Sequence, residues 1–434
     1  MTERLYWTKP KGKEFTATVV KVVQPRKKDY GPGLVLDRTL FYPEGGGQPC
    51  DQGCLRLGGY TTCGDREPAN STPHCALFEG VELAVTRVED EGEGILHWLA
   101  AGVNLATIPL GACVRGTIDW ERRFDHMQQH TGQHVLSWAF LRELEVPTTG
   151  FHLSADYASI DLAVSTLTDL EVRRVEDLAN RVVFANVPIE AHEYLPDELP
   201  GEVRRRILKA TGKVRVVHIG HFDACACGGT HLATTGEIGL IKINEVTRAK
   251  AHGGTRVIFR CGWRALRDYT VKERTLLQAA RDLARPYTEV AHGVSALLVK
   301  VEEAEKETKE LRAALLEQEA KLLAREVDAN NPLVRELPGR SMDELRQLAK
   351  AVATMSGSTI VLFALEPRFS VTIAAGNKVV FDCRAAAAKI GEFFGLRGGG
   401  TSNIAQIGSR DPWRGDSAIV AARIRKVLES VSYA

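Results

Sequence analysis

The sequence predicts a mixed α+β protein built from several domains. Its 434 residues exceed the usual length of one domain, and a hydrophobic content of 44% suffices for two or three cores. The spacing of apolar residues also changes twice along the chain. We therefore expect a small β-barrel at 1–118, an α+β core at 119–262, a helical linker at 263–328 and an α/β domain at 329–434.

The N-terminal region has the pattern of short strands. Apolar and polar residues alternate at 15–23 (FTATVVKVV) and again at 33–37. Gly, Pro and Asp interrupt the rest of the stretch up to Asp119, as expected for turns between strands. This combination predicts a small barrel.

The second region mixes helices and strands. Asp119 or Asp125 can cap a helix that runs to about Arg142. Gly132 inside this helix costs about 1 kcal/mol relative to Ala, so we expect a backbone or a ligand to approach it closely. The other predicted elements are a helix at 169–186 and strands at 158–163, 214–219, 238–246 and 256–260.

The third region has helical periodicity at 264–285, a break at Pro286 and a second helix to about Glu326. The second helix carries a heptad pattern that predicts a coiled coil, either within a helical hairpin or between two copies in a homodimer. Its positions are Val294, Leu297, Val301, Ala304, Thr308, Leu311, Leu315, Gln318 and Leu322. Beyond Asn331, strands at 359–364 and 369–374 and helices at 383–394 and 417–431 predict a separate α/β domain.

Two pairs of metal-ligating residues indicate a metal site. His130 and His134 are four residues apart, and so are Cys227 and His231. On a helix this spacing places both side chains on one face. Three imidazoles and one thiolate suit tetrahedral zinc, so we predict one zinc ion per chain.

The nine cysteines favour reduced thiols over a secreted disulfide framework. No apolar run reaches the roughly 20 residues of a membrane span, and the N-terminus lacks an apolar signal core. We therefore expect a cytoplasmic protein with no membrane partner. A second metal site could form from Cys50, Cys54 and Cys63 with His74 or Cys75. Our default interpretation is that these cysteines are separate reduced thiols.

Three strings carry a family resemblance: DRTLFYPEGGGQPCDQG (37–53), RRFDHMQQHTGQH (122–134) and CGGTH (227–231). They resemble the editing domain of alanyl-tRNA synthetase, most closely the free-standing alanyl-tRNA editing proteins of the AlaX group. RGGGTSNIAQIGS (397–409) resembles the C-terminal DHHA1 domain that follows such editing domains. Because the chain starts almost directly with the barrel, we expect no aminoacylation domain and an enzyme that edits in trans.

The resemblance implies a trans-editing hydrolase that deacylates Ser-tRNA(Ala), with Gly-tRNA(Ala) as a further candidate substrate. It favours a catalytic zinc whose bound water attacks the ester, and we assign no protein base. Four protein ligands are nevertheless typical of a closed structural site, so catalysis needs an open coordination position. His126, four residues before His130, is expected to contact RNA, to support the ligands or to lie at the surface.

The resemblance also places Thr39 and Gln48 in the amino-acid pocket, where the Thr39 hydroxyl would recognise the hydroxyl of serine. The amides of Gly45, Gly46 and Gly47 could bind the ester carbonyl, although a bare GGG is more typical of a tight hairpin. The predicted tRNA-binding residues are Lys389, Arg397, Gly398, Gly399, Gly400, Asn403 and Gln406.

Two other functions compete with this interpretation. One is a non-catalytic protein that binds tRNA or a synthetase and uses zinc structurally. The other is a zinc hydrolase of a different aminoacyl ester, such as Ser-tRNA(Thr) or Thr-tRNA(Thr). A net charge of +1 is no signature of a nucleic-acid binder.

Overall fold

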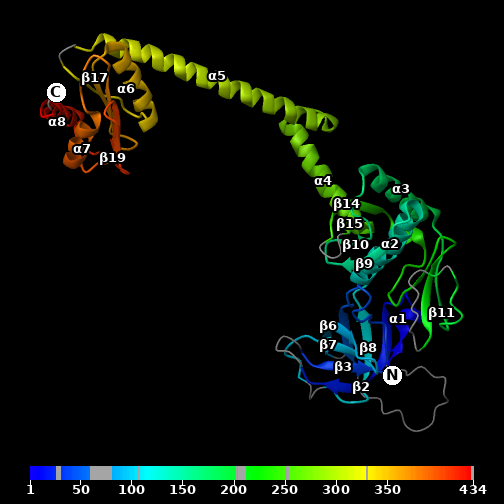
Figure 1. Cartoon of the computed structure of the whole chain (residues 1–434). Coiled ribbons are helices and arrows are strands. Elements are labelled where there is room, and N and C mark those ends of the chain that lie inside the picture. Colours follow the sequence, from blue (N-terminus) through cyan, green and yellow to red (C-terminus); the bar gives the residue numbers. More distant parts are fainter. Residues whose placement is uncertain are drawn as a thin grey trace, which may run out of the picture. The chain divides into compact units, whose positions relative to one another are not determined.

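The computed structural model describes residues 1–25, 31–58, 81–104, 108–201, 203, 212–249, 254–328 and 331–431. The chain divides into two compact units, Met1–Gln278 and Ala279–Ala434 (Figure 1). Among the described residues, no helix combines the length and apolar composition that crossing a membrane requires.

The first unit begins with a closed barrel in the strand order β2-β3-β7-β6-β5-β8. The strands are β2 (Glu14–Val23), β3 (Gly33–Leu36), β5 (Gly53–Leu57), β6 (Glu82–Asp90), β7 (Ile95–Leu99) and β8 (Cys113–Ile118). Phe15, Ala17 and Val19 alternate along β2 and are buried in the barrel core, as the two-residue period of a strand requires. The predicted N-terminal barrel is confirmed.

Three short elements attach the N-terminus to the barrel. They are β1 (Glu3–Arg4), α1 (Leu5–Thr8) and β4 (Arg38–Thr39). Strands β1 and β4 pair in parallel, and Leu5 of α1 is buried with the barrel residues. The start of the chain is thus held against the segment that precedes the glycine-rich loop.

Helix α2 (Trp120–Leu144) is the central helix of the first unit. The Asp119 side chain caps it by accepting the Arg122 N–H at 3.1 Å. A Cβ on Gly132 would lie 2.3 Å from Cys261 Sγ, so a close approach does account for this glycine, but the expected kind of neighbour is wrong. The approaching group is the side chain of Cys261 on β15 (Thr255–Cys261), not a ligand or a backbone.

Two sheets and a helix accompany α2. The four-stranded sheet has the order β14-β15-β10-β9, and the three-stranded sheet has the order β11-β12-β13. The remaining bounds are β9 (Thr148–Leu153), β10 (Ala158–Leu162), α3 (Asp169–Ala185), β11 (Ile189–Tyr194), β12 (Val214–Ile219), β13 (Asp223–Ala226) and β14 (Ile241–Arg248). The predicted strand start at Ile238 is wrong, because a 3-10 helix, η2 (Thr235–Ile238), and Gly239 with φ of 80° precede β14.

A buried ion pair joins the barrel to α2. Arg123 and Asp51 are both fully inaccessible, and Arg123 Nε lies 3.0 and 3.1 Å from the two carboxylate oxygens. Asp51 also accepts the Tyr42 N–H at 2.7 Å, and Arg123 donates to the Leu40 carbonyl at 2.6 Å. These bonds attach both ends of segment 40–51 to the first turn of α2.

Helix α4 (Gly262–Asp282) follows the core, and α5 (Val290–Arg325) begins after a short 3-10 turn, η3 (Tyr287–Glu289). The predicted break at Pro286 is confirmed. All nine positions of the predicted heptad seam of α5 are solvent-exposed. They include the large apolar side chains of Val294, Leu297, Val301, Leu311, Leu315 and Leu322.

The second unit contains a five-stranded sheet in the order β16-β17-β18-β20-β19. Val361 and Phe363 pack with α7 and α8, whereas Ile360 and Leu362 pack with α6, so the helices cover both faces. The bounds are β16 (Leu333–Glu336), α6 (Met342–Ser356), β17 (Thr359–Ala364), β18 (Ser370–Ala375), α7 (Cys383–Phe394), β19 (Arg397–Gly400), β20 (Ile404–Gly408) and α8 (Ser417–Glu429).

Among the cysteines that the structure describes, Cys113 departs from expectation. Cys113 is disulfide-bonded, although reduced thiols were expected. The free cysteines are Cys50, Cys54, Cys225, Cys227, Cys261 and Cys383. Cys63, His74 and Cys75 of the alternative metal site lie outside the described residues.

Candidate metal centre

The structure brings together the four residues that the sequence predicted as metal ligands. His130 and His134 lie one turn apart on α2, Cys227 follows β13, and His231 lies in the loop before η2. One ligand atom from each residue fits within a cluster in which all these atoms are 4.8 Å or less apart. The predicted grouping is therefore confirmed among the described residues.

The spacing of these atoms fits a tetrahedral ion. Cys227 Sγ lies 3.4 Å from His130 Nε2 and 3.4 Å from His231 Nε2. Ligands bound 2.0–2.3 Å from a tetrahedral zinc would be separated by about 3.3–3.7 Å. The donor set suits zinc, and both distances from Cys227 Sγ fall within this range.

The Nδ1 atom of each histidine faces an oxygen. His130 Nδ1 donates to Gln48 Oε1 at 2.8 Å, since an amide oxygen can only accept. His231 Nδ1 lies 3.2 Å from Thr131 Oγ1, and His134 Nδ1 lies 4.0 Å from Asp223 Oδ2. The hydrogen bonds of His130 and His231 leave Nε2 of those two rings as the metal-binding atom, because outer hydrogen bonds select the tautomer of a ligating imidazole. The 4.0 Å separation between His134 and Asp223 is too long for a hydrogen bond.

Burial favours the neutral form of the His231 ring. The pKa of His231 lies well below its ordinary value because the side chain is desolvated, and because His130 and His134 are close. A neutral imidazole keeps the lone pair that a metal requires. The electrostatics therefore keep His231 available as a ligand at neutral pH.

The Cys227–His231 segment is an irregular loop, so the expectation that a helix presents this pair is wrong. The loop owes its shape to backbone contacts: Gly229 N–H donates to Cys227 Sγ at 3.4 Å. A Cβ at Gly229 would lie 2.2 Å from His130 Cε1, whereas one at Gly228 would meet nothing within 4 Å. Only Gly229 is required by the packing of the ligands.

Gln48 is hydrogen-bonded to the metal-binding motif. Its Oε1 accepts from His130 and from the Thr230 N–H at 3.2 Å, and its Nε2 donates to Thr230 Oγ1 at 2.8 Å. The whole side chain is inaccessible to solvent. The structure therefore places Gln48 next to the ligands, with its amide engaged within the protein.

Thr39 is also fully buried, and its hydroxyl is engaged in the barrel. His97 Nδ1 lies 3.0 Å from the Leu34 carbonyl and must donate to it, so His97 Nε2 accepts from Thr39 Oγ1 at 2.8 Å. Burial lowers the pKa of His97 to about 4, which keeps the ring neutral. Thr39 Oγ1 also accepts the Phe41 N–H at 3.0 Å.

The glycine-rich loop forms a tight turn. Gly45 and Gln48 exchange two backbone hydrogen bonds, at 2.9 and 3.1 Å. Gly46 and Gly47 at its centre have φ of 60° and 85°, which glycine adopts at little cost. A Cβ on Gly47 would also lie 2.8 Å from the Phe151 ring, which stacks on His130 at a centroid distance of 5.3 Å. The loop thus supports the candidate metal ligand His130 through the ring of Phe151.

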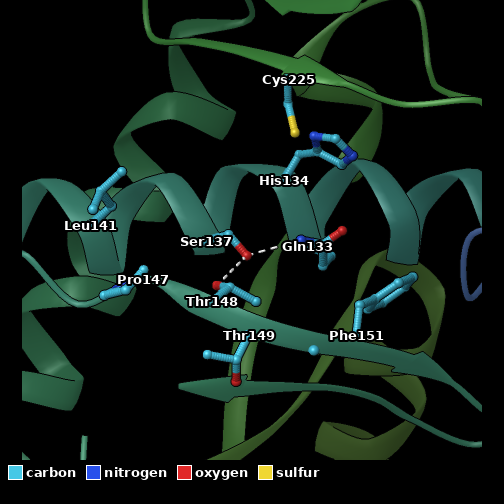
Figure 2. A pocket seen from close by; sticks show the side chains of 10 residues that line it. Gln133, His134, Ser137, Leu141, Pro147, Thr148, Thr149, Phe151 and Cys225 are labelled. Carbon is cyan, nitrogen blue, oxygen red and sulfur yellow. Dashed lines mark hydrogen bonds between the residues drawn. The ribbon is translucent and has the colours of Figure 1, made fainter. Parts of the chain in front are cut away.

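A cavity of about 280 Å³ adjoins the candidate metal centre (Figure 2). His134 and Cys225 lie at one side of it, and Phe151 lines another part. Ser137 Oγ accepts from Gln133 Nε2 at 2.9 Å and lies 2.8 Å from Thr148 Oγ1. The complete lining is Gln133, His134, Ser137, Leu141, Pro147, Thr148, Thr149, Gly150, Phe151 and Cys225.

Sequence analysis missed the polar residues of this cavity. Gln133 and Ser137 follow His130 at helical spacing, which could have placed them on the side of α2 near the ligands. Thr148 lies on β9, a strand that the sequence pattern did not indicate. His126 is buried, which excludes the surface role, and desolvation and nearby arginines lower its pKa to about 3.

Some of the predicted tRNA-binding residues in the second unit are engaged in contacts within the protein. Lys389 Nζ donates to the Ser430 carbonyl at 2.9 Å, and Gln406 Nε2 donates to the Met342 carbonyl at 2.9 Å. A Cβ on Gly398 or Gly400 would lie within 2.2 Å of a backbone oxygen of β20, whereas Gly399 faces open space. Strand pairing therefore accounts for two of the three glycines.

The Arg397 side chain is exposed to solvent and lies at a cavity of the second unit. It lines a cavity of about 500 Å³ together with Arg340 and Arg368. Arg340 pairs with Glu319 at 2.7 Å and with Glu344 at 3.4 Å, which offsets its charge. The cavity also contains hydroxyl groups from Ser341, Ser370 and Ser409.

Comparison with known proteins places this fold and site among tRNA-synthetase-related proteins. Residues 214–257 match the threonyl and alanyl tRNA synthetase second additional domain. The chain is 34% identical over 433 residues to alanine--tRNA ligase of Pyrococcus abyssi, across 96% of this chain and 43% of the ligase. It therefore spans less than half the length of that relative.

A relative of similar length identifies the family. The alanyl-tRNA editing protein AlaX-L of Pyrococcus horikoshii is 31% identical over 417 residues, which cover 94% of both chains. This chain belongs to the family of alanyl-tRNA editing proteins. The crystal structure of the C-Ala domain from Aquifex aeolicus alanyl-tRNA synthetase matches 22% of this chain at 14% identity, with a TM-score of 0.21.

The two glycines of the metal-binding loop offer a matched pair of variants. In Gly229→Ala the new methyl group would collide with His130, so we expect zinc affinity to fall about 10–100-fold, the range seen when support of a ligand is disturbed. Gly228→Ala is the control, because its methyl group meets open space. Competition with a chromophoric chelator measures both affinities, and equal affinities would contradict the proposed packing.

Proposed function

We propose that this protein is a zinc-dependent aminoacyl-tRNA deacylase that hydrolyses Ser-tRNA(Ala) in trans. The observation that carries the proposal is the position of His134, which belongs to the metal cluster and also lines the adjoining cavity. Membership of the alanyl-tRNA editing family supports this substrate class. Gly-tRNA(Ala) is a second candidate substrate.

His130, His134, Cys227 and His231 would hold the zinc. When bound, the metal supplies a Lewis acid that polarises an ester carbonyl. Gln48 and Phe151 hold the His130 ring in place, through a hydrogen bond and a stacking contact respectively.

The cavity offers the means to distinguish serine from alanine. Ser137, Thr148 and Gln133 form a short chain of hydrogen bonds along its wall. A hydroxyl on the substrate could join this chain, whereas the methyl group of alanine would leave polar groups unpaired. Sites that pair with a substrate hydroxyl can discriminate by about 10⁴-fold, which would spare correctly charged Ala-tRNA(Ala).

A panel of aminoacyl-tRNAs tests the function directly. We expect the zinc-loaded protein to hydrolyse Ser-tRNA(Ala) about 10⁴-fold faster than Ala-tRNA(Ala). Chelation should abolish this activity while circular dichroism and size exclusion remain unchanged. Gly-tRNA(Ala), Ser-tRNA(Thr) and Thr-tRNA(Thr) complete the panel.

Each competing function has its own outcome in this assay. Preference for a threonine-tRNA ester would favour the alternative hydrolase. Retention of tRNA binding without any deacylation would favour the non-catalytic protein with a structural zinc.

Two hydroxyl deletions test where serine is recognised. We expect Ser137→Ala to lower hydrolysis of Ser-tRNA(Ala) at least tenfold, because a lost hydrogen bond in a buried site costs about 1–3 kcal/mol. The family resemblance predicts the same loss for Thr39→Val. The geometry instead predicts reduced stability for Thr39→Val, because His97 loses its hydroxyl donor.

Single-turnover rates and thermal melting of both variants separate these two predictions. Zinc content serves as the control for an intact centre. A wild-type rate of hydrolysis in Ser137→Ala would show that the cavity does not recognise serine. If Thr39→Val hydrolyses Ser-tRNA(Ala) slowly but is as stable as the wild-type protein, the result would support recognition of serine at Thr39.

We propose that the second unit, which resembles a DHHA1 domain, supplies tRNA affinity. Arg368 and Arg397 are both exposed beside one cavity, and guanidinium groups bind phosphates well. The exposed heptad residues of α5 also support the predicted pairing with a second copy of the chain.

Salt titration tests the arginine cavity. In the double variant Arg368→Gln and Arg397→Gln, we expect weaker tRNA binding and a salt-dependence slope smaller by about 2, one for each lost phosphate contact. Lys389→Gln is the comparison, because Lys389 already donates to the Ser430 carbonyl. An unchanged slope in the double variant would exclude this cavity as a phosphate site.

A further inference from the structure

Three consecutive backbone carbonyl groups in the loop that carries Cys227 accept hydrogen bonds from side chains outside the loop. Arg215 on β12 donates from one nitrogen to the carbonyl of Cys227 at 2.8 Å and to that of Gly229 at 3.0 Å. Trp7 on α1 donates from Nε1 to the carbonyl between them, that of Gly228, at 2.9 Å. Both donors lie outside the metal-binding motif, and Trp7 is 221 residues from its partner in sequence.

Fixing these carbonyls also fixes the N–H groups of the loop. The C=O and N–H groups of a trans peptide point in opposite directions. The N–H that follows the Gly228 carbonyl belongs to Gly229 and donates to Cys227 Sγ at 3.4 Å. The N–H that follows the Gly229 carbonyl belongs to Thr230 and donates to Gln48 Oε1 at 3.2 Å. The carbonyl contacts on one side thus direct the amides toward Cys227 and Gln48 on the other.

The side chains that hold the loop also support one another. The Arg215 guanidinium lies 5.9 Å from the centre of the Trp7 ring, and the Arg4 guanidinium lies 5.0 Å from it. A cation at this distance from an indole ring is attracted to it. The Arg215 side chain is itself only partly exposed.

We propose that Arg215 and Trp7 are positioning residues that hold the Cys227–Gly229 backbone in the conformation required for metal binding. The inference rests on the proposed metal centre, but it concerns residues that contact neither the ion nor the substrate. Arg215 fixes two peptide groups and Trp7 fixes the one between them. Loss of either donor allows a peptide group to rotate and moves Cys227 Sγ relative to the three imidazoles.

Metal affinity, rather than activity, tests the proposal in the full-length protein. Removal of an outer partner of a metal ligand costs about 10–100-fold in affinity, so we expect this loss in Arg215→Met. Trp7→Phe keeps an aromatic ring but removes one donor, and its loss of affinity should be smaller. Arg215→Lys keeps the charge and should recover part of the affinity. Lys213→Met is the control, because Lys213 is an exposed neighbour of β12 whose Nζ lies 3.5 Å from Glu193.

Chelator competition gives the zinc affinity, and the cobalt-loaded proteins report the thiolate through its charge-transfer absorption. Circular dichroism establishes that each variant is folded. Wild-type affinity and absorption in folded Arg215→Met would overturn the proposal while leaving the metal centre intact. If Arg215→Met fails to fold, unchanged affinity in both Trp7→Phe and Arg215→Lys would overturn it instead. Failure of the wild-type protein to bind zinc would overturn the metal centre and this inference together.

Discussion

The buried ion pair between Arg123 and Asp51 is the interaction on which the geometry of the candidate site depends. Both side chains are inaccessible to solvent, so losing one partner would leave an uncompensated charge at a cost of about 3–5 kcal/mol. Asp51 lies three residues after Gln48, and Arg123 lies two turns before His130 on the same helix. The pair therefore sets the position of the glycine-rich loop relative to α2, and Gln48 can reach His130 and Thr230 as a result.

Small residues then bring these segments into contact. Gly132 admits Cys261 against α2, and Gly229 admits the ring of His130. Gly47 admits Phe151, whose ring stacks on the same histidine. Each glycine thus stands where a side chain would separate two parts of the site, and the close packing that results restricts the imidazoles to one arrangement.

The donor set also suits an electrophilic function. Three neutral imidazoles and one thiolate would leave a bound divalent zinc with a net charge of about +1, whereas sites rich in cysteine neutralise the ion. Arg215 adds positive charge beside Cys227 without occupying a coordination position. Because His134 borders both the cluster and the cavity, a small acyl group in the cavity would lie next to the metal.

The sequence by itself determined the α+β class and the barrel, because strand alternation and helical periodicity are local properties. It also named the four clustered ligands from the spacing within each pair, although only His130 and His134 lie on a helix. It missed α6, although Ser341 and Glu344 form the capping box that marks its start. Only the tertiary structure decided what surrounds the ligands. Thr39 pairs with His97, Gln48 pairs with His130, and the cavity forms where α2 meets β9. These contacts join residues far apart in the chain, such as Trp7 and Gly228, whose meeting depends on how the barrel and the core pack together.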